Sequence, residues 1–272
     1  MGAKVVQDSS LVAVADAIRA KTGKNESMEF PDGFVSEIEG ISGGFDWDDF
    51  VNHTAPESII LDTATVIQKY MFAGTGIQSI SSDSVTEIKE YAFCECSNLK
   101  SVSFPNLTVM RNGTGTNTNS NGQFFSGCDS IETLYLPKLQ DVYGNYAFSV
   151  SSNMTKAANP VVLPSIRNLG VRAFRQFNAS VIDLGPNLVQ ILADTFYNGS
   201  VPILILRGSA VVPAVSTDAI NSLRAVYVHS ALIESYKTAT NWSTRYNAGN
   251  ITFHAIEGSQ YETAYADGTP IT

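Results

Sequence analysis

The stretch Tyr91–Leu107, YAFCECSNLKSVSFPNL, carries the pattern that decides the fold. An aromatic residue is followed by a Cys, a Leu and a short alternating segment that ends before a Pro. The positions three, six, nine and eleven residues after Phe93 match the same positions after Phe125. The matched residues are Cys96, Leu99, Val102 and Phe104 in the first copy, and Cys128, Ile131, Leu134 and Leu136 in the second. Two copies in register indicate an internal repeat.

Weaker copies extend the repeat in both directions. Their aromatic anchors are Phe72, Phe93, Phe125, Phe148, Phe174 and Phe196, separated by 21, 32, 23, 26 and 22 residues. This period is typical of leucine-rich repeats. Each unit contains one short strand and one turn or short helix, and neither can bury its apolar side without a stacked neighbour. The pattern predicts an α+β, β-rich solenoid of about six to seven irregular coils.

The alternation within each strand predicts which side chains form the core. Val102, Phe104, Leu134 and Leu136 are expected to point inward, and Ser101, Ser103, Thr133 and Tyr135 to form the presented surface. Cys96 and Cys128 are expected to stack as small buried hydrophobes in successive coils. The Pro that follows each strand ends the ladder and turns the chain.

The pattern AF-x-x-C-x-x-L-x-x-V-x-x-P resembles the leucine-rich repeats of the BspA-like surface proteins of bacteria, over about residues 58–256. The resemblance implies a right-handed solenoid used for adhesion or recognition, without catalytic machinery. Residues 223–258 are similar to the closing segment of such proteins, a strand followed by a helix and a last strand. Only two repeat cysteines are in register, and Phe177 stands where a third would fall.

Composition limits the classes of partner. The 17 basic and 26 acidic residues give a net charge of -9, and no Lys/Arg cluster offers a phosphate-binding surface, so nucleic acid is not an expected partner. No apolar run reaches the roughly 18 residues that span a bilayer, so membrane insertion is not expected. The N-terminus lacks the order of regions found in a signal peptide, and the chain is expected to be soluble and assembled in the cytoplasm.

Residues 1–43 differ from the repeats and predict a helical anchoring or oligomerisation module. Apolar residues at helical spacing predict an amphipathic helix over 9–22 and a shorter one over 32–39. The expected contact residues are Leu11, Val14, Ile18, Phe34, Ile38 and Ile41. Two short helices cannot enclose a core alone, so they must dock on another protein or on copies of themselves, most simply three. This segment also resembles the N-terminal module of tail and baseplate proteins in the virions of phages that infect Gram-positive bacteria.

Domain boundaries follow from the turn-rich segments. Ser42–Asp49 is the expected linker, so a solenoid with terminal caps is expected over residues 44–258 and a tail over 259–272 that is ordered only if it docks. At the C-terminal cap, Leu232, Tyr236 and Trp242 are expected to cover the last coil, with Ser230 as a helix N-cap.

The sequence predicts no catalytic, cofactor or metal site. Cys94, Cys96 and Cys128 have no His at ligand spacing, and they are interpreted as reduced core residues. The acidic pairs at Asp48 and Asp49 and near Glu87 and Glu90 are interpreted as a solvated face. The sequence also lacks the GxSxG, HExxH and phosphate-loop motifs.

The segment 111–122, RNGTGTNTNSNG, lengthens one repeat and predicts a protruding loop. It can be a tolerated insertion, because long loops are entropically cheap, or a ligand-contacting loop on a binding face. The candidate contact residues are Arg111, Asn112, Thr116, Asn117, Asn119, Tyr135 and Tyr143.

These features favour a non-enzymatic phage virion protein whose N-terminal module docks to other virion proteins or self-associates. The solenoid is then displayed to recognise a glycan or protein on the host surface. The alternative is an adhesin or scaffold at the surface of a Gram-positive cell. An enzyme that acts on surface polysaccharide is the least favoured hypothesis.

Overall fold

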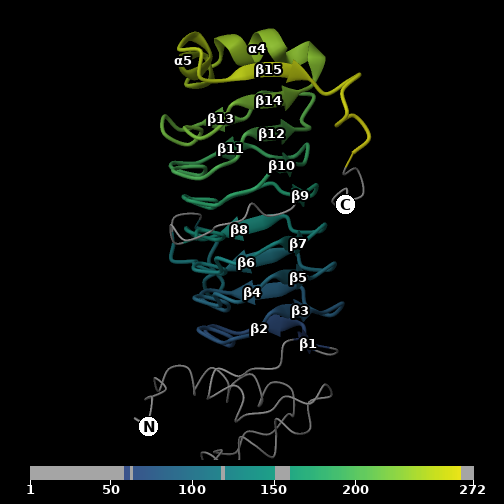
Figure 1. The fold of residues 1–272 in the computed structure, drawn as a ribbon, viewed down its shortest axis with the longest axis vertical. Coiled ribbons are helices and arrows are strands. Elements are labelled where there is room, and N and C mark those ends of the chain that lie inside the picture. The colour runs from purple at the N-terminus through teal and green to yellow at the C-terminus, as the bar shows by residue number, and fades with distance from the viewer. Residues whose placement is uncertain (1–57, 62–63, 118–119, 151–159, 265–272) are drawn as a thin grey trace, which may run out of the picture.

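The computed structural model describes residues 58–61, 64–117, 120–150 and 160–264. The predicted N-terminal helices with their contact residues, the linker and Asn119 lie outside the described residues. Within them, the chain forms a column of stacked coils, each shifted along the long axis from the one before (Figure 1). This is the solenoid that the repeat predicts.

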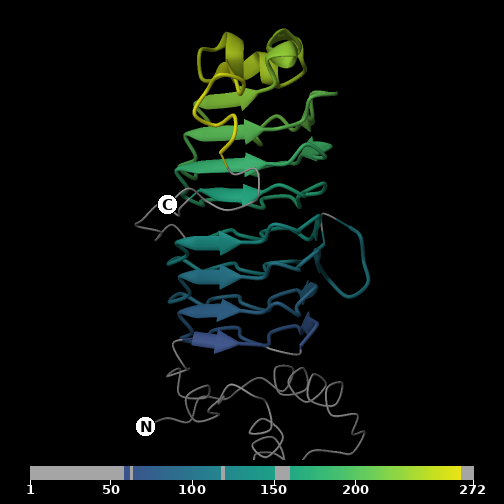
Figure 2. The same ribbon diagram turned by 90° about the vertical axis from the view of Figure 1, so that its right-hand side faces the viewer.

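A nine-stranded parallel sheet runs the length of the column, in the order β1-β3-β5-β7-β9-β10-β12-β14-β15. Its strands are β1 (Ser58–Ile60), β3 (Ser79–Ser81), β5 (Ser101–Ser103), β7 (Thr133–Tyr135), β9 (Val161–Leu163), β10 (Val181–Leu184), β12 (Ile203–Leu206), β14 (Ala225–Val228) and β15 (Thr252–Ala255). Figure 2 shows them as a ladder of arrows with one direction. Parallel strands in adjacent coils follow from a chain that returns to the same side after each turn.

A second series of short strands lies on another side of the coils and was not predicted. It comprises a four-stranded sheet of β2 (Val66–Ile67), β4 (Glu87–Lys89), β6 (Val109–Arg111) and β8 (Asp141–Tyr143), and a two-stranded sheet of β11 (Gln190–Ile191) and β13 (Ala214–Val215). The one-strand unit inferred from the repeat was therefore incomplete. These strands contain only two or three residues, so their alternation is too short to identify without the neighbouring coil.

The predicted orientation of the main strands is confirmed. Val102 pairs with Leu134 in register, and these side chains are 0% and 2% exposed. Ser101, Ser103 and Tyr135 alternate with them and are partly exposed. The core is therefore the interior of the coils, and one face of every strand remains on the outside.

The six phenylalanine anchors form one continuous stack inside the column. Successive ring centroids, from Phe72 to Phe196, lie 5.3, 4.8, 5.6, 5.0 and 5.9 Å apart, with planes within 10° of parallel. Because each ring contacts the rings of both neighbouring coils, the stack aligns the repeat in three dimensions.

The repeat cysteines are buried and unpaired, as predicted. Cys96 Sγ donates to Phe72 O at 2.8 Å, and Cys128 Sγ donates to Phe93 O at 3.0 Å, in each case in the preceding coil. Burial, with Glu95 nearby, raises the pKa of Cys94 to about 11, so this partly exposed thiol stays protonated at neutral pH.

The C-terminal cap closes the last coil between β14 and β15. It consists of the 3-10 helix η1 (Ser230–Leu232), α4 (Ile233–Thr238) and α5 (Trp242–Asn247). Tyr236 and Trp242 are fully buried, and Trp242 Nε1 donates to Pro213 O at 3.0 Å. The prediction of Ser230 as N-cap was wrong, because His229 precedes η1 and its Nδ1 accepts from Ala231 N.

A smaller apolar cluster lies outside the main core. It joins residues of β9, β10 and β12 with Ile256, Tyr261 and Ala264. The described part of the predicted tail therefore packs against the outer face of the nine-stranded sheet. Among the described residues, no helix has the length and apolar character needed to cross a bilayer.

Candidate ligand-binding surface

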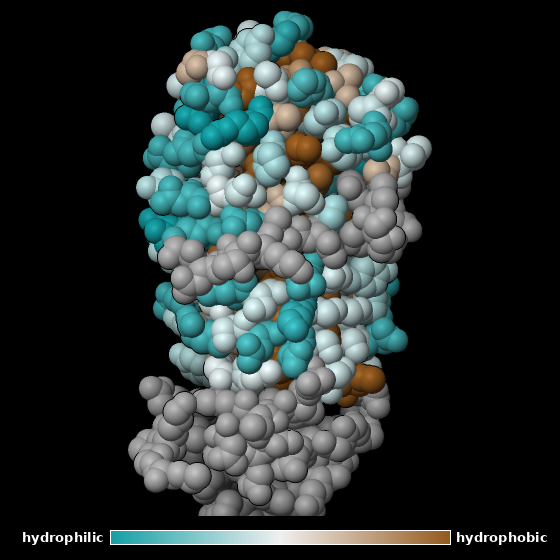
Figure 3. Space-filling model, in the orientation of Figure 1, coloured by the Kyte–Doolittle hydropathy of each residue, from teal (hydrophilic) through white to brown (hydrophobic). Residues whose placement is uncertain are grey.

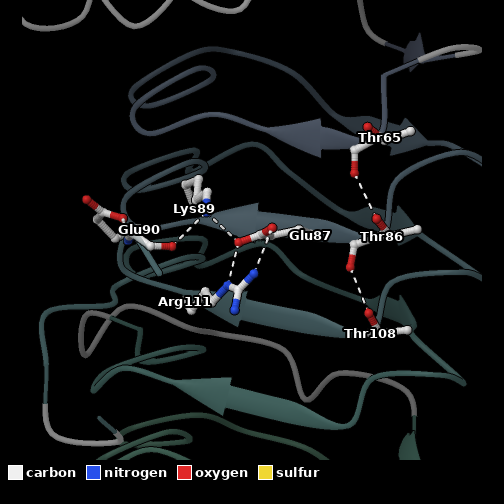
Figure 4. Close-up of polar contacts among 8 residues, drawn as sticks. Thr65, Thr86, Glu87, Lys89, Glu90, Thr108 and Arg111 are labelled. Atoms are coloured by element: carbon white, nitrogen blue, oxygen red, sulfur yellow. Dashed lines mark hydrogen bonds and ion pairs between the residues drawn. The ribbon is translucent and has the colours of Figure 1, made fainter. Parts of the chain in front are cut away.

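The strands of the four-stranded sheet hold a network of charged side chains at the base of the long loop (Figure 4). Glu87 accepts hydrogen bonds from Lys89 and from Arg111, whose Nε and Nη2 lie 2.7 and 3.3 Å from the two carboxylate oxygens. Glu90 is 6% exposed and pairs with Lys69 at 3.1 Å. The prediction that these two carboxylates form a solvated face was wrong, because the neighbouring coils supply cations that the linear sequence does not place beside them.

The network also affects ionisation. Partial burial disfavours the charged form of Glu87, but the hydrogen bonds from Arg111 and Lys89 outweigh burial and lower the pKa of this carboxyl. The same bond to Glu87 raises the pKa of Arg111. The charges compensate one another, so the network positions backbone rather than offering a free acid or base.

The coils that carry the network are also tied by a threonine ladder, which lies at the beginning of β2, β4 and β6. Thr86 Oγ1 donates to Thr65 O at 3.2 Å, and Thr108 Oγ1 donates to Thr86 O at 3.1 Å (Figure 4). Each hydroxyl thus reaches the coil before it, and the side of the column that carries the loop is held in a fixed register.

The long loop leaves the column directly after β6, as predicted, and forms the teal loop at the right of Figure 2. At its start, Gly113 O accepts from Lys89 Nζ at 2.7 Å and Gly113 N donates to Glu90 Oε2 at 3.4 Å. Residues 113–117 are exposed. The loop therefore has an anchored beginning and an exposed, polar tip.

The returning end of the loop is anchored as well. Ser120 Oγ lies 2.8 Å from Asn117 O and 3.4 Å from Tyr143 O, and Asn121 forms a bridge with Asn145. A Cβ on Gly144 would lie 2.7 Å from Gly122 Cα, so only glycines permit this approach of loop and coil. We call Lys89, the loop and Tyr143 the loop-bearing edge.

The structure brings most of the predicted contact residues together but separates one. Arg111 and Tyr143 are register partners on β6 and β8, and Asn112, Thr116 and Asn117 follow in the loop. Tyr135 lies on β7 of the other sheet, in register with Ser103 and Val162. The candidate set therefore does not form one site.

An aromatic feature of the same side was missed. Tyr70 and Tyr91, each two residues before a phenylalanine anchor, stack with ring centroids 4.9 Å apart, and Lys69 Nζ lies 5.1 and 5.6 Å from the two ring centres. Both tyrosines have φ 60°, and the residues at this position before the other anchors, Gln123, Tyr146, Arg172 and Asp194, also have positive φ, between 47° and 58°. Aligning the repeats on their phenylalanine anchors could have identified these two tyrosines as equivalent positions, but it could not have shown that their rings stack beside Lys69.

Other features of the described surface offer little chemistry. A depression of about 350 Å³ is lined by polar residues of two coils, Asn198, Gly199, Ser200, Pro202, Asn221, Ser222 and Arg224. The described residues contain no group of three or more His, Cys, Asp or Glu placed to hold a metal ion. In the view of Figure 3, their apolar atoms form small patches, mainly over the upper coils.

Comparisons with known proteins identify the repeat. The BspA type leucine rich repeat region matches residues 65–202 in six copies, about half of the chain. A leucine-rich repeat protein from Bacteroides ovatus ATCC 8483, with a crystal structure at 1.19 Å resolution, is similar at 14% identity and a TM-score of 0.37. That alignment covers 73% of this chain and 64% of the other, less than two thirds of its length. No curated protein matches the sequence. The chain belongs to the family of BspA type leucine-rich repeat proteins.

Proposed function

We propose that this chain is a non-enzymatic recognition protein of a phage virion. Residues 1–43 dock to other virion proteins or self-associate, and the solenoid is displayed to bind a glycan or protein on the host surface. The family assignment supports the general role, because stacked repeats build an extended surface suited to binding. The particle assignment rests on the resemblance of residues 1–43 to phage modules.

The loop-bearing edge is the proposed contact surface. The observation that carries this proposal is the combination of an anchored loop base with an exposed polar tip. A pre-positioned loop loses less conformational entropy on binding than a free one. Thr116 and Asn117 supply hydrogen-bonding groups, and Tyr143 on the adjacent strand adds an amphipathic ring.

Replacing Gly113–Asn121 by a short turn tests the contact surface. We expect only a small change in unfolding free energy, provided that the turn restores the backbone contacts of Gly113 and Asn121, because loop length is entropically cheap. We expect a clear loss of binding to host cells. The double substitution Thr116→Ala, Asn117→Ala should weaken binding at least about fivefold, as expected for losing about 1 kcal/mol of hydrogen bonding.

The matched control is the double substitution Asn187→Ala, Thr217→Ala, which removes similar exposed groups from other coils. Adhesion that is unchanged in the loop variants, or equally reduced in the control, would identify the loop as a tolerated insertion. Co-purification of the protein with phage particles tests the virion assignment. Recovery in the bacterial wall fraction instead would support the cellular adhesin or scaffold.

A further inference from the structure

From β9 to β14, which is the upper half of the column in Figure 1, the outer face of the nine-stranded sheet is apolar, and another segment of the chain covers it. Val162, Val181 and Ile205 point away from the main core, yet they are 1%, 5% and 0% exposed. In the lower half, the positions in register with them include Ser81 and Ser103, which are partly exposed. We call the apolar outer residues of β9, β10, β12 and β14 the apolar strip: Val162, Val181 and Ile205, with the partly buried Ile203 and Tyr227 packed against them.

The cover is the segment that follows β15, and we call residues 256–264 the C-terminal segment. It is the yellow trace that runs down beside the upper strands in Figures 1 and 2. Ile256, Tyr261 and Ala264 bury their side chains on the apolar strip, to 8%, 6% and 6% exposure. The ring of Tyr261 meets that of Tyr227 edge to face, with centroids 4.7 Å apart and planes at 74°.

Arg207 donates hydrogen bonds to backbone carbonyl oxygens of the C-terminal segment. Arg207 Nη2 donates to Tyr261 O at 3.0 Å and to Ala264 O at 2.6 Å, and its Nη1 lies 3.5 Å from Glu262 O. The guanidinium is held in place by Asp183, which accepts from Nε and from Nη2 at 2.9 and 2.7 Å and is 1% exposed. A charged fork fixed by a buried carboxylate is a pre-organised receptor for carbonyl oxygens.

The C-terminal segment folds largely upon itself. Ser259 N donates to Ile256 O at 3.0 Å, Glu262 N donates to Ser259 O at 3.2 Å, and Gly258 N donates to Glu262 Oε2 at 3.0 Å. Gly258 has φ +75°, a conformation that side-chain-bearing residues rarely adopt, and it lies within the segment shortly after the end of β15. The segment is thus a small turn unit that contacts the strip through side chains and carbonyl oxygens.

We propose that the apolar strip is a second interaction surface of this protein, which accepts a short turn-forming peptide that bears a tyrosine, and that the C-terminal segment, residues 256–264, is its internal ligand. The contacts are those of a bound peptide: an aromatic ring, a small apolar residue and carbonyls that face a guanidinium. A segment of the same chemistry in another protein can make them without a shared chain. The strip lies on a different sheet from the loop-bearing edge and does not depend on it.

A labelled synthetic peptide of residues 256–264, IEGSQYETA, tests the proposal against the full-length protein. Two variants are designed to free the strip in different ways. Tyr261→Ala removes the aromatic ring. Gly258→Val strains the backbone at a position with positive φ and leaves the contacting side chains Ile256, Tyr261 and Ala264 unchanged. Fluorescence anisotropy should show that both bind the peptide at least about tenfold more tightly than the parent protein, whose strip is self-occupied. Hydrogen exchange monitors release of the C-terminal segment, and circular dichroism monitors the fold.

Two controls identify the contacts. A peptide with Ala in place of the tyrosine should not bind. Arg207→Lys in the Tyr261→Ala background keeps a cation beside Asp183 but loses the fork, and it should weaken binding about tenfold. If both strip-freeing variants are folded and release the segment yet bind no peptide, the strip is only a packing surface. If neither variant releases the segment, the Tyr261 ring and the Gly258 turn do not hold it in place, and the proposal also fails.

Discussion

The two halves of the outer face of the nine-stranded sheet have the same backbone and different chemistry. In register along one column, Ser81, Ser103 and Tyr135 precede Val162, and Asp183 and Ile205 follow it. The lower positions face solvent, and the upper ones are buried beneath the C-terminal segment. The comparison teaches that coil geometry depends on the inner face, while the outer face can change without altering the strand register.

The largest expected difference between the halves concerns Asp183. Replacing Asp183 by Ala leaves Arg207 without its buried partner and should lower the unfolding free energy by about 3 to 5 kcal/mol. Ser103→Ala, one column position in the lower half, should change it by less than about 0.5 kcal/mol. Urea denaturation of both variants measures the difference. Similar losses would show that the two halves do not differ energetically.

On the inner face of the sheet, we expect substitutions in the two halves to lower the unfolding free energy by similar amounts. Leu134 and Leu204 are buried at inward positions of β7 and β12, 2% and 0% exposed. Truncating either one to Ala should cost about 2 to 5 kcal/mol, since each leaves a cavity in the same core. Thr133→Ala, the adjacent outward position, should cost much less. Equal losses at Leu134 and Thr133 in denaturant melts would contradict the strand orientation.

The smallest expected effect is a pH dependence specific to the upper half. Burial raises the pKa of Asp183 from 3.8 to about 6, despite the opposing hydrogen bonds and charge of Arg207. A raised pKa means that the folded state binds the proton more tightly than the unfolded state. The stabilisation is therefore complete below the unfolded pKa, near 4, and is lost as pH rises through about 6. Its size should be on the order of 3 kcal/mol.

The check is to measure unfolding free energy from pH 4 to pH 7 for the parent protein and for Asp183→Asn. The parent should lose stability relative to the variant over this range, because the amide does not titrate. A difference that stays constant, or that grows in the opposite direction, would show that Asp183 is not held in this way.

The repeat was predictable from the sequence because its core is strictly periodic. The offsets after Phe93 and Phe125 identified the buried cysteines and the inward strand positions, and they marked the phenylalanine anchors, whose stacked rings only the structure shows. The exposed loop at 111–122 was predictable for a related reason, since a polar, glycine-rich segment has no apolar side to bury.

The composition of the sites was less predictable. Glu87 and Glu90 look like surface charges in sequence, but Arg111 and Lys69 lie beside them only after the coils stack. Tyr135 and Tyr143 are eight residues apart, yet the chain turns between β7 and β8 and places them on different sheets. Contacts between coils depend on residues more than twenty positions apart, which a local pattern does not pair.

By itself, the sequence determined that this protein is a stacked solenoid with a polar loop, because burying a periodic apolar face requires a stacked neighbour. Only the tertiary structure decided which outer positions are covered. Val162, Val181 and Ile205 belong to strands that read as buried in any case, and Tyr261 lies in a polar stretch that reads as a tail. Their contact arises because the chain returns along the sheet and Arg207 holds it there, a long-range pairing that no local periodicity encodes.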